Sequence, residues 1–464
     1  MLDLNSVSEV HMVGIGGVSM SALAHALRDK GAHVTGSDVA ESERVKHLRT
    51  LGITVHIGHS ETNLDSPDLI IYTSAVNGQN PELAAGRTRG IPVIHRSELL
   101  AWFLKDKRGM AVAGTHGKTT TTAMVGLILR DAGLDPTIFL GGISLDLEDN
   151  YRLGGSDIVI FEADESDASF RQYRDCSQVI TNVEADHLDQ HRDFEAVRSA
   201  FANFIRIGDP HGFLVYGSDC PALSDLVREC PGTARSFALG DRSAFYRATA
   251  MATAGCRTTA TLLVEGQQAG ELELHMPGRH NVANALAALG MAHMLEVPIE
   301  QCLDSLAHFS GTSRRFERIY ERGKLRIYDD YAHHPTEIRA ALSAARDAFG
   351  GVHLTAVFQP HLPSRTKFLL EDFAGAFSDA DCVIINAIYL AREKPIPGFS
   401  AQQLADRIRE VAPDKPVYYF DNQDELLEFV YGRIDQEELL IFIGAGDITA
   451  VGRGLASRLV EERR

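Results

Sequence analysis

A glycine loop between an apolar strand and the start of a helix constrains the fold of this chain most strongly. The stretch Gly109–Ala113 reads as a buried strand, and a Thr-rich helix start follows it. Backbone N–H groups in such a turn converge on phosphate groups. Lys118 would then reach the β and γ phosphates, and the Thr119 hydroxyl would hold Mg²⁺. The predicted ATP-binding residues of this loop are Gly114, Thr115, His116, Gly117, Lys118, Thr119 and Thr120.

The loop is a variant of the usual phosphate-binding pattern. That pattern, G-x-x-x-x-G-K-[ST], would place its first glycine at position 112, where this chain has Val112. A turn at a helix N-terminus without a ligand is the alternative. The strand, loop and helix order together with the Gly-Lys-Thr triplet favours the phosphate site.

Strand-like and helix-like segments alternate along the chain, which predicts parallel α/β sheets. The length of 464 residues exceeds one ordinary core and suggests three domains. We expect an N-terminal Rossmann-like domain, a central P-loop ATPase-like domain with a parallel or mixed sheet, and a C-terminal Rossmann-like domain. The predicted boundaries are 1–107, 108–310 and 311–464.

Charge and composition narrow the possible partners. The net charge of −18 disfavours a binder of nucleic-acid backbone, which would need clustered cations. The apolar stretches are strand-sized, and the N-terminus does not read as a secretory signal, so no membrane association is expected. The six cysteines are scattered without a C-x-x-C pair, as expected for free thiols in a reducing compartment.

A second glycine loop lies near the N-terminus, where Val10–Val13 reads as a strand. The G-x-G turn suits a pyrophosphate at a helix N-terminus, although Ser19 stands at the third glycine position of the dinucleotide pattern. A tight turn without a ligand and an NAD site are both open alternatives. The candidate binding residues are Gly14, Gly16, Gly17, Asp38 and Ser74.

Several motifs, in their order, resemble the Mur ligase family over essentially the whole chain. They are HMVGIGGVSMSALA, GTHGKTTT, EADESDASF, TNVEADHLD, PGRHNVANALAA, DDYAHHPTE and FQPHLPSRT. The order is similar to that of the branch which adds alanine. The resemblance implies an ATP-dependent ligase of peptidoglycan precursor synthesis, and it implies that the N-terminal glycine loop holds the UDP part of the substrate.

The resemblance also implies a metal site in the central domain. It makes Thr119, Glu162 and His187 the ligands of Mg²⁺, with two ions expected and Mn²⁺ as a possible substitute. Taken alone, the acidic residues 162–167 read as a solvated loop and His187 as a surface histidine. No lysine occurs between Thr119 and Gly323, so a carbamylated lysine, which several relatives use, cannot form there.

In the C-terminal part, the resemblance implies contacts to ATP and to the incoming amino acid. The motif FQPHLPSRT departs from the family, because Leu362 and Pro363 replace an arginine and a tyrosine. Arg365 then remains as the candidate that grips the amino-acid carboxylate. The predicted ATP contacts are His280, Asn281, Arg315 and Asp330, and the predicted amino-acid contacts are Tyr331, His333 and Arg365.

The implied reaction joins L-alanine to the lactyl carboxylate of UDP-N-acetylmuramate through an acyl phosphate formed from ATP. Lys118 would stabilise phosphoryl charge, and the residues leave open whether His187 or His333 takes the amine proton. Addition of another amino acid or of a recycled peptide is the alternative within the family, and an NAD-dependent oxidoreductase is a distant one. We expect a bacterial cytoplasmic enzyme, monomeric or homodimeric.

Overall fold

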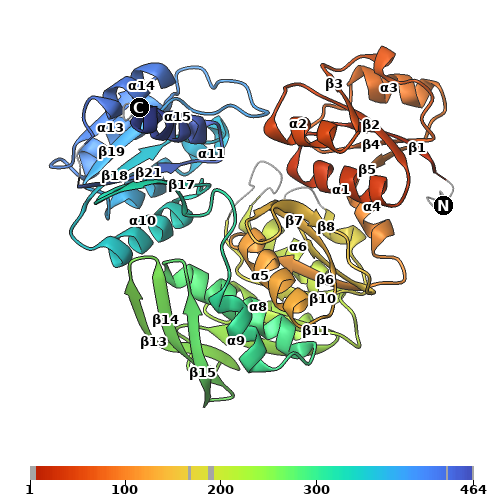
Figure 1. The fold of residues 1–464 in the computed structure, drawn as a ribbon, viewed down its shortest axis with the longest axis horizontal. Coiled ribbons are helices and arrows are strands. Elements are labelled where there is room, and N and C mark those ends of the chain that lie inside the picture. Colours follow the sequence, from red (N-terminus) through yellow and green to blue (C-terminus); the bar gives the residue numbers. More distant parts are fainter. Residues whose placement is uncertain (1–6, 166–168, 186–192, 435–436, 462–464) are drawn as a thin grey trace. The chain divides into compact units, whose positions relative to one another are not determined.

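The computed structural model describes residues 7–165, 169–185, 193–434 and 437–461. These residues form three β-sheets, with helices packed on them (Figure 1). The chain forms two compact units. The first comprises residues 1–184, 195–246 and 285–305, and the second comprises residues 185–194, 247–284 and 306–464. The expected class of three α/β domains is confirmed. Among the described helices, none is long and apolar enough to cross a membrane.

The N-terminal sheet has the strand order β3-β2-β1-β4-β5, with every pair parallel. The chain order reverses between β1 and β4, which is the switch point where open α/β sheets bind ligands. Gly31, with φ at +88°, follows the first helix as a stop signal. The elements are β1 (Glu9–Val13), α1 (Val18–Asp29), β2 (His33–Asp38), α2 (Glu43–Thr50), β3 (Thr54–Ile57), η2 (Glu61–Asn63), β4 (Leu69–Tyr72), α3 (Pro81–Thr88), β5 (Val93–His95) and α4 (Arg96–Phe103).

The second sheet has ten strands in the order β15-β14-β13-β12-β11-β10-β6-β9-β7-β8. Its parallel centre brings the carboxyl ends of β6, β9 and β10 to one edge. The elements up to β12 are β6 (Arg108–Ala113), α5 (Lys118–Asp131), β7 (Thr137–Ser144), β8 (Asp149–Arg152), β9 (Ile158–Glu162), η3 (Ser169–Gln172), β10 (Ser177–Ile180), α6 (Phe194–Arg206), β11 (Phe213–Gly217), α7 (Pro221–Leu226), η4 (Val227–Glu229) and β12 (Thr233–Ala238). The remaining elements are β13 (Tyr246–Ala254), β14 (Arg257–Val264), β15 (Gln267–Leu274), α8 (Arg279–Met294) and α9 (Ile299–Ala307).

The third sheet has the order β16-β17-β21-β18-β19-β20, and only its edge strand β16 runs antiparallel to its neighbour. Aliphatic and aromatic side chains fill both faces, as expected for a parallel sheet covered by helices. The elements are β16 (Glu317–Arg322), β17 (Leu325–Asp330), α10 (Pro335–Phe349), β18 (His353–Phe358), α11 (Pro363–Phe368), α12 (Leu370–Ala374), η5 (Gly375–Phe377), β19 (Cys382–Asn386), α13 (Ala401–Val411), β20 (Val417–Phe420), α14 (Gln423–Tyr431), β21 (Glu438–Ile443) and α15 (Ile448–Glu461).

Candidate active site

The phosphate loop connects β6 to α5, as its sequence predicts. Gly117 precedes the helix with φ at +84°, and no side chain caps the helix there. Gly114 has φ at +134°, and a Cβ at this position would lie 2.0 Å from the Thr181 hydroxyl oxygen. Both positions therefore require glycine, and the uncapped N-terminus of α5 offers N–H groups to an anion.

Residues after β10 hold the loop in shape. The backbone N–H of His116 donates to Asn182 Oδ1 at 2.9 Å, and Asn182 Nδ2 donates to the His116 carbonyl at 3.1 Å. The Thr181 hydroxyl donates to the same carbonyl at 2.6 Å. Asn182 thus supports the phosphate loop, a role that the sequence analysis did not predict. The available signal was its position at the end of a strand parallel to β6.

The side chain of Lys118 is largely buried rather than exposed in the loop. It is the first residue of α5, and its side chain is 15% exposed. Lys118 Nζ donates to the Gly114 carbonyl at 2.6 Å and to Glu165 Oε2 at 2.9 Å. Burial alone would lower the pKa of Lys118, but the negative charges of Glu165 and Asp164 raise it above the usual value. The lysine therefore carries a positive charge at the phosphate loop.

Glu165 is the functional candidate that sequence reasoning missed. Its side chain is 2% exposed, so the acidic run is not a fully solvated loop. A buried carboxylate is costly unless a cation accompanies it. The ion pair between Glu165 and Lys118 supplies that cation.

Thr119 and Glu162, two of the predicted metal ligands, lie in contact. The Thr119 hydroxyl donates to Glu162 Oε2 at 3.1 Å, and the Gly141 N–H donates to the other carboxylate oxygen. Burial raises the pKa of Glu162, because the charged form loses hydration. A hydroxyl and a carboxylate are oxygen donors of the kind that Mg²⁺ prefers, so these residues fit the predicted ion.

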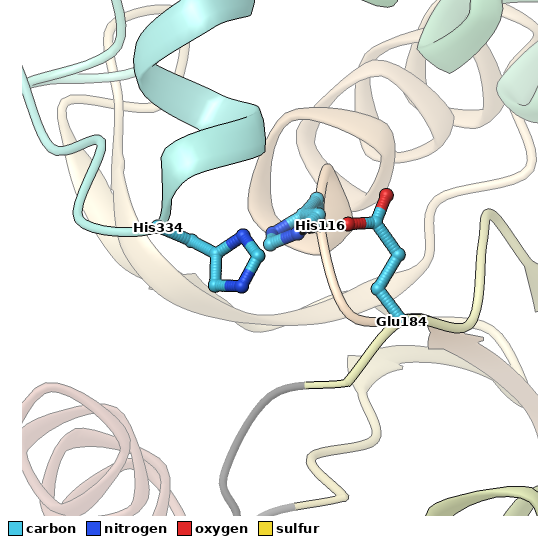
Figure 2. Close-up of side chains that lie close together, drawn as sticks. All are labelled: His116, Glu184 and His334. Carbon is cyan, nitrogen blue, oxygen red and sulfur yellow. Dashed lines mark ion pairs between the residues drawn. The ribbon is translucent and has the colours of Figure 1, made fainter. Parts of the chain in front are cut away.

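Figure 2 shows the His116 ring directed toward the Glu184 carboxylate, with 3.5 Å between His116 Nε2 and Glu184 Oε2. The pair brings together the phosphate loop and the segment after β10. His334, also labelled in Figure 2, belongs to the second unit, where its ring accepts from the Thr336 N–H at the start of α10. The predicted ligand and base His187 lies outside the described residues.

The N-terminal glycine loop lies at the carboxyl edge of its sheet, as expected for a pyrophosphate site. Gly14 has φ at +80°, and a Cβ at Gly16 would lie 2.9 Å from Asp38 Oδ2. That same oxygen accepts from the Gly16 N–H at 2.9 Å. Ser74, on the neighbouring side of the switch point, contacts His95 Nε2 at 2.9 Å. The five predicted UDP-binding residues thus follow β1, β2 and β4 at one edge.

In the second unit, Asp330, the last residue of β17, and Arg315, which precedes β16, form part of one polar cluster. Asp330 accepts from the N–H groups of Phe316 and Ala332, each at 2.8 Å. Burial raises the pKa of Asp330 to about 6, although the nearby Arg315 charge lowers it. Arg315 Nη1 lies 3.6 Å from Glu337 Oε1, and its guanidinium lies 5.1 Å from the centre of the Tyr331 ring.

His333, the predicted base, lies near a carboxylate within the same cluster. Its Nδ1 is 3.1 Å from the Tyr331 carbonyl and 3.3 Å from Glu337 Oε2. Glu337 also accepts from the backbone N–H of His333 at 2.9 Å. These contacts orient the ring.

His280 and Asn281 begin α8 but differ in environment. His280 is exposed. Asn281 is buried, its Nδ2 donates to the Pro277 carbonyl at 2.7 Å, and its Oδ1 accepts from Asn284 Nδ2 at 3.5 Å.

Arg365 is buried within α11 and is not a surface arginine. Leu362, which replaces the family's arginine, is also buried, and its φ of +67° is unusual for a residue with a side chain. Its carbonyl accepts from the Thr366 N–H at 3.0 Å. The substitution at position 362 therefore exchanges a polar side chain for an apolar contact.

Three family profiles match consecutive segments of the chain. They are described as Mur ligase family, catalytic domain (residues 9–108), Mur ligase middle domain (residues 112–292) and Mur ligase, glutamate ligase domain (residues 314–446). The first segment contains the N-terminal glycine loop, and the second contains the phosphate loop.

Relatives of similar length match over nearly the whole chain. A UDP-N-acetylmuramate–L-alanine ligase from Trichlorobacter lovleyi is 39% identical over 98% of this chain and 99% of its own length. One of the same description from Sorangium cellulosum is 41% identical over 98% and 97%. The crystal structure of a UDP-N-acetylmuramate-alanine ligase from Thermotoga maritima is 32% identical, with a TM-score of 0.85 over 98% of this chain and 99% of that one.

Proposed function

Since the chain belongs to the Mur ligase family, we propose that it joins L-alanine to the lactyl carboxylate of UDP-N-acetylmuramate at the expense of ATP. The family membership confirms the resemblance predicted from the motifs. It also removes the oxidoreductase alternative, because the N-terminal glycine loop belongs to a Mur ligase segment. We propose L-alanine as the amino acid because relatives that are 39% and 41% identical over nearly the whole chain are named for ligation of L-alanine.

The observation that carries the ATP-dependent chemistry is the set of groups around the phosphate loop. Lys118, charged and held by Glu165, supplies a cation for the γ phosphate. The lactyl carboxylate attacks the γ phosphorus of ATP, the bond between that phosphorus and the oxygen bridging to the β phosphate breaks, and ADP leaves as the acyl phosphate forms. The alanine amine then attacks the activated carbonyl, and phosphate leaves with the C–O electron pair.

A magnesium ion bound by Thr119 and Glu162 would neutralise phosphate charge. His187 remains a proposed further ligand. His280, Asn281, Arg315 and Asp330 are proposed ATP contacts. Within the second unit, Tyr331, His333 and Arg365 are proposed for the amino acid, with His333 or His187 taking the proton of the amine. The compartment proposed is the bacterial cytoplasm, where ATP and UDP-sugars occur.

The proposed ligase reaction can be tested by measuring ADP release with a panel of amino-acid acceptors. ADP release should require UDP-N-acetylmuramate and be fastest with L-alanine, compared with glycine, L-serine and D-alanine. UDP-N-acetylglucosamine, which lacks the lactyl carboxylate, is the matched control and should give no ADP above background. The tripeptide L-alanyl-γ-D-glutamyl-meso-diaminopimelate should be a poor acceptor. If it supported faster ADP release than L-alanine, ligation of this tripeptide to UDP-N-acetylmuramate, the reaction in the name of a solved Neisseria meningitidis protein, would replace our proposal.

A further inference from the structure

A buried glutamate below the proposed UDP site has more polar contacts than a helix start requires. Glu82 is the second residue of α3, and its side chain is fully buried. Acidic residues at helix N-termini are favourable, but they commonly remain in water. An ionised carboxylate in the interior costs free energy unless several donors surround it.

The donors around Glu82 come from three different segments. The Ser37 hydroxyl of β2 donates to Oε2 at 2.5 Å. On the other oxygen, Asn63 Nδ2 donates at 2.6 Å and the Ser60 N–H donates at 3.2 Å. His11 of β1 lies with its Nε2 3.5 Å from Oε2. Burial alone would raise the pKa of Glu82, but the nearby His11 ring and the hydrogen bonds from Ser37 and Asn63 lower it to about 2. The carboxylate is therefore ionised at neutral pH and acts only as an acceptor.

This arrangement determines the tautomer of His59. The Ser37 hydroxyl gives its one hydrogen to Glu82, so its oxygen must accept from its other partner, His59 Nδ1, at 2.9 Å. Nδ1 of His59 then carries the hydrogen, and in the neutral ring Nε2 is left as an acceptor. Among the described residues, none contacts His59 Nε2, and the side chain is 17% exposed.

The same serine connects this ring to the glycine loop. The Ser37 carbonyl accepts from the N–H groups of Gly14 and Ile15 at 2.8 and 3.1 Å. His59 follows the end of β3, and the Gly58 N–H donates to the Asp38 carbonyl at 2.7 Å. His59 thus lies at the carboxyl edge that carries Gly14, Gly16 and Asp38.

We propose that Glu82 is a positioning residue for the nucleotide: through Ser37 it holds His59 in the tautomer whose Nε2 accepts a hydrogen bond from the bound nucleoside. This inference rests on the proposed UDP site. The group recognised is a hydrogen-bond donor, which UDP can supply from the uracil N3–H or from a ribose hydroxyl.

Calorimetric binding of UDP to the full-length protein tests the proposal. Ser37→Ala keeps the carboxylate and removes the hydroxyl between it and His59, so that only the longer approach of His59 Nδ1 to Glu82 Oε2, at 3.5 Å, remains. It should weaken UDP binding about tenfold, or ~1.4 kcal/mol. Glu82→Gln should have a similar effect, and the double variant should bind no more weakly than the weaker single variant, because both act through His59. In turnover, the KM for the UDP-sugar should rise, while kcat and the KM for ATP should stay within about twofold of wild type.

Matched controls separate positioning from general loss of structure. Ser60→Ala removes a hydroxyl contact to Thr62 in the same loop, and Glu61→Gln changes an exposed carboxylate beside it. Neither should change UDP binding. Equal losses in Ser60→Ala and Ser37→Ala, or a rise in the KM of every substrate, would overturn the positioning role. If Glu82→Gln fails to fold, Ser37→Ala decides alone.

The tautomer of His59 can also be determined by NMR spectroscopy, independently of any activity assay. In ¹⁵N-histidine-labelled protein at neutral pH, the His59 resonances, assigned by their loss in His59→Gln, should show hydrogen on Nδ1 only. Hydrogen on both ring nitrogens, or on Nε2 alone, would contradict the proposal.

Nucleotide analogues identify the donor. N3-methyl-UDP should bind more weakly if uracil supplies the hydrogen, and 2′-deoxy- or 3′-deoxy-UDP should do so if the ribose does. Equal binding of all analogues would refute a contact with His59. Wild-type protein that fails to bind UDP would refute the proposed function. Wild-type protein that binds UDP, with affinity unchanged in Ser37→Ala and Glu82→Gln, would refute only the positioning role.

Discussion

Replacing Lys118 should separate a catalytic loss from a stability loss. In Lys118→Met, ADP release should fall to background, because no cation remains for the γ phosphate. The variant should also be less stable, because Glu165 keeps its charge at 2% exposure after its partner at 2.9 Å is removed. Removing one member of a buried ion pair costs roughly 3–5 kcal/mol. Since the Lys118 side chain is 15% exposed, water can reach the carboxylate, and we expect a cost of about 3 kcal/mol.

The double variant Lys118→Met/Glu165→Gln distinguishes the two effects. It removes the unpaired charge, so urea unfolding should recover about 2 kcal/mol relative to Lys118→Met, whereas ADP release should stay at background. Lys105→Met, at an exposed lysine, is the control and should match wild type in both assays. An unfolding midpoint of Lys118→Met equal to wild type would refute the buried ion pair. Near-normal ADP release would refute the phosphate site.

Four further outcomes follow from the site. Arg365→Ala should raise the KM for L-alanine roughly 30- to 150-fold, for a lost charge-assisted contact of about 2–3 kcal/mol, with little change in the KM for ATP; equal changes in both would indicate an interdomain strut. Glu162→Gln should raise the Mg²⁺ concentration for half-maximal rate and lower kcat, and an unchanged magnesium dependence would remove Glu162 from the metal ligands. Bicarbonate should not affect activity, because no lysine lies between Thr119 and Gly323, and activity that disappeared on CO₂ removal would contradict this. The pKa of Asp330 is raised to about 6, so its ionisation should destabilise the native protein as pH rises from about 4 to 6; Asp330→Asn should lose this part of the pH dependence of unfolding, and identical profiles would refute it.

Local patterns in the sequence were enough to predict the α/β class, the strand before each glycine loop and the helix after it. They suffice because a turn that needs positive φ, as at Gly14 and Gly114, requires glycine irrespective of distant contacts. The order of motifs was likewise enough to predict the family. Of the predicted metal ligands, Thr119 followed from the phosphate-loop pattern and Glu162 from the resemblance, and the structure places their side-chain oxygens 3.1 Å apart.

Only the tertiary structure decided which charged residues are buried and with whom they pair. Glu165 lies 47 positions from Lys118, and Glu82 lies 45 positions from Ser37, so neither contact leaves a local periodicity. From the sequence alone, a run of acidic residues is interpreted as a solvent-exposed loop, because charged residues are mostly exposed and composition does not show which of them are buried. Folding places parallel strand ends at one edge, and that placement converts Glu165 into the partner of the phosphate-loop lysine. It likewise buries Glu82 against Ser37, whose carbonyl accepts from the N-terminal glycine loop. In this buried environment an unmade hydrogen bond is costly, so the partners of Glu82 are fixed.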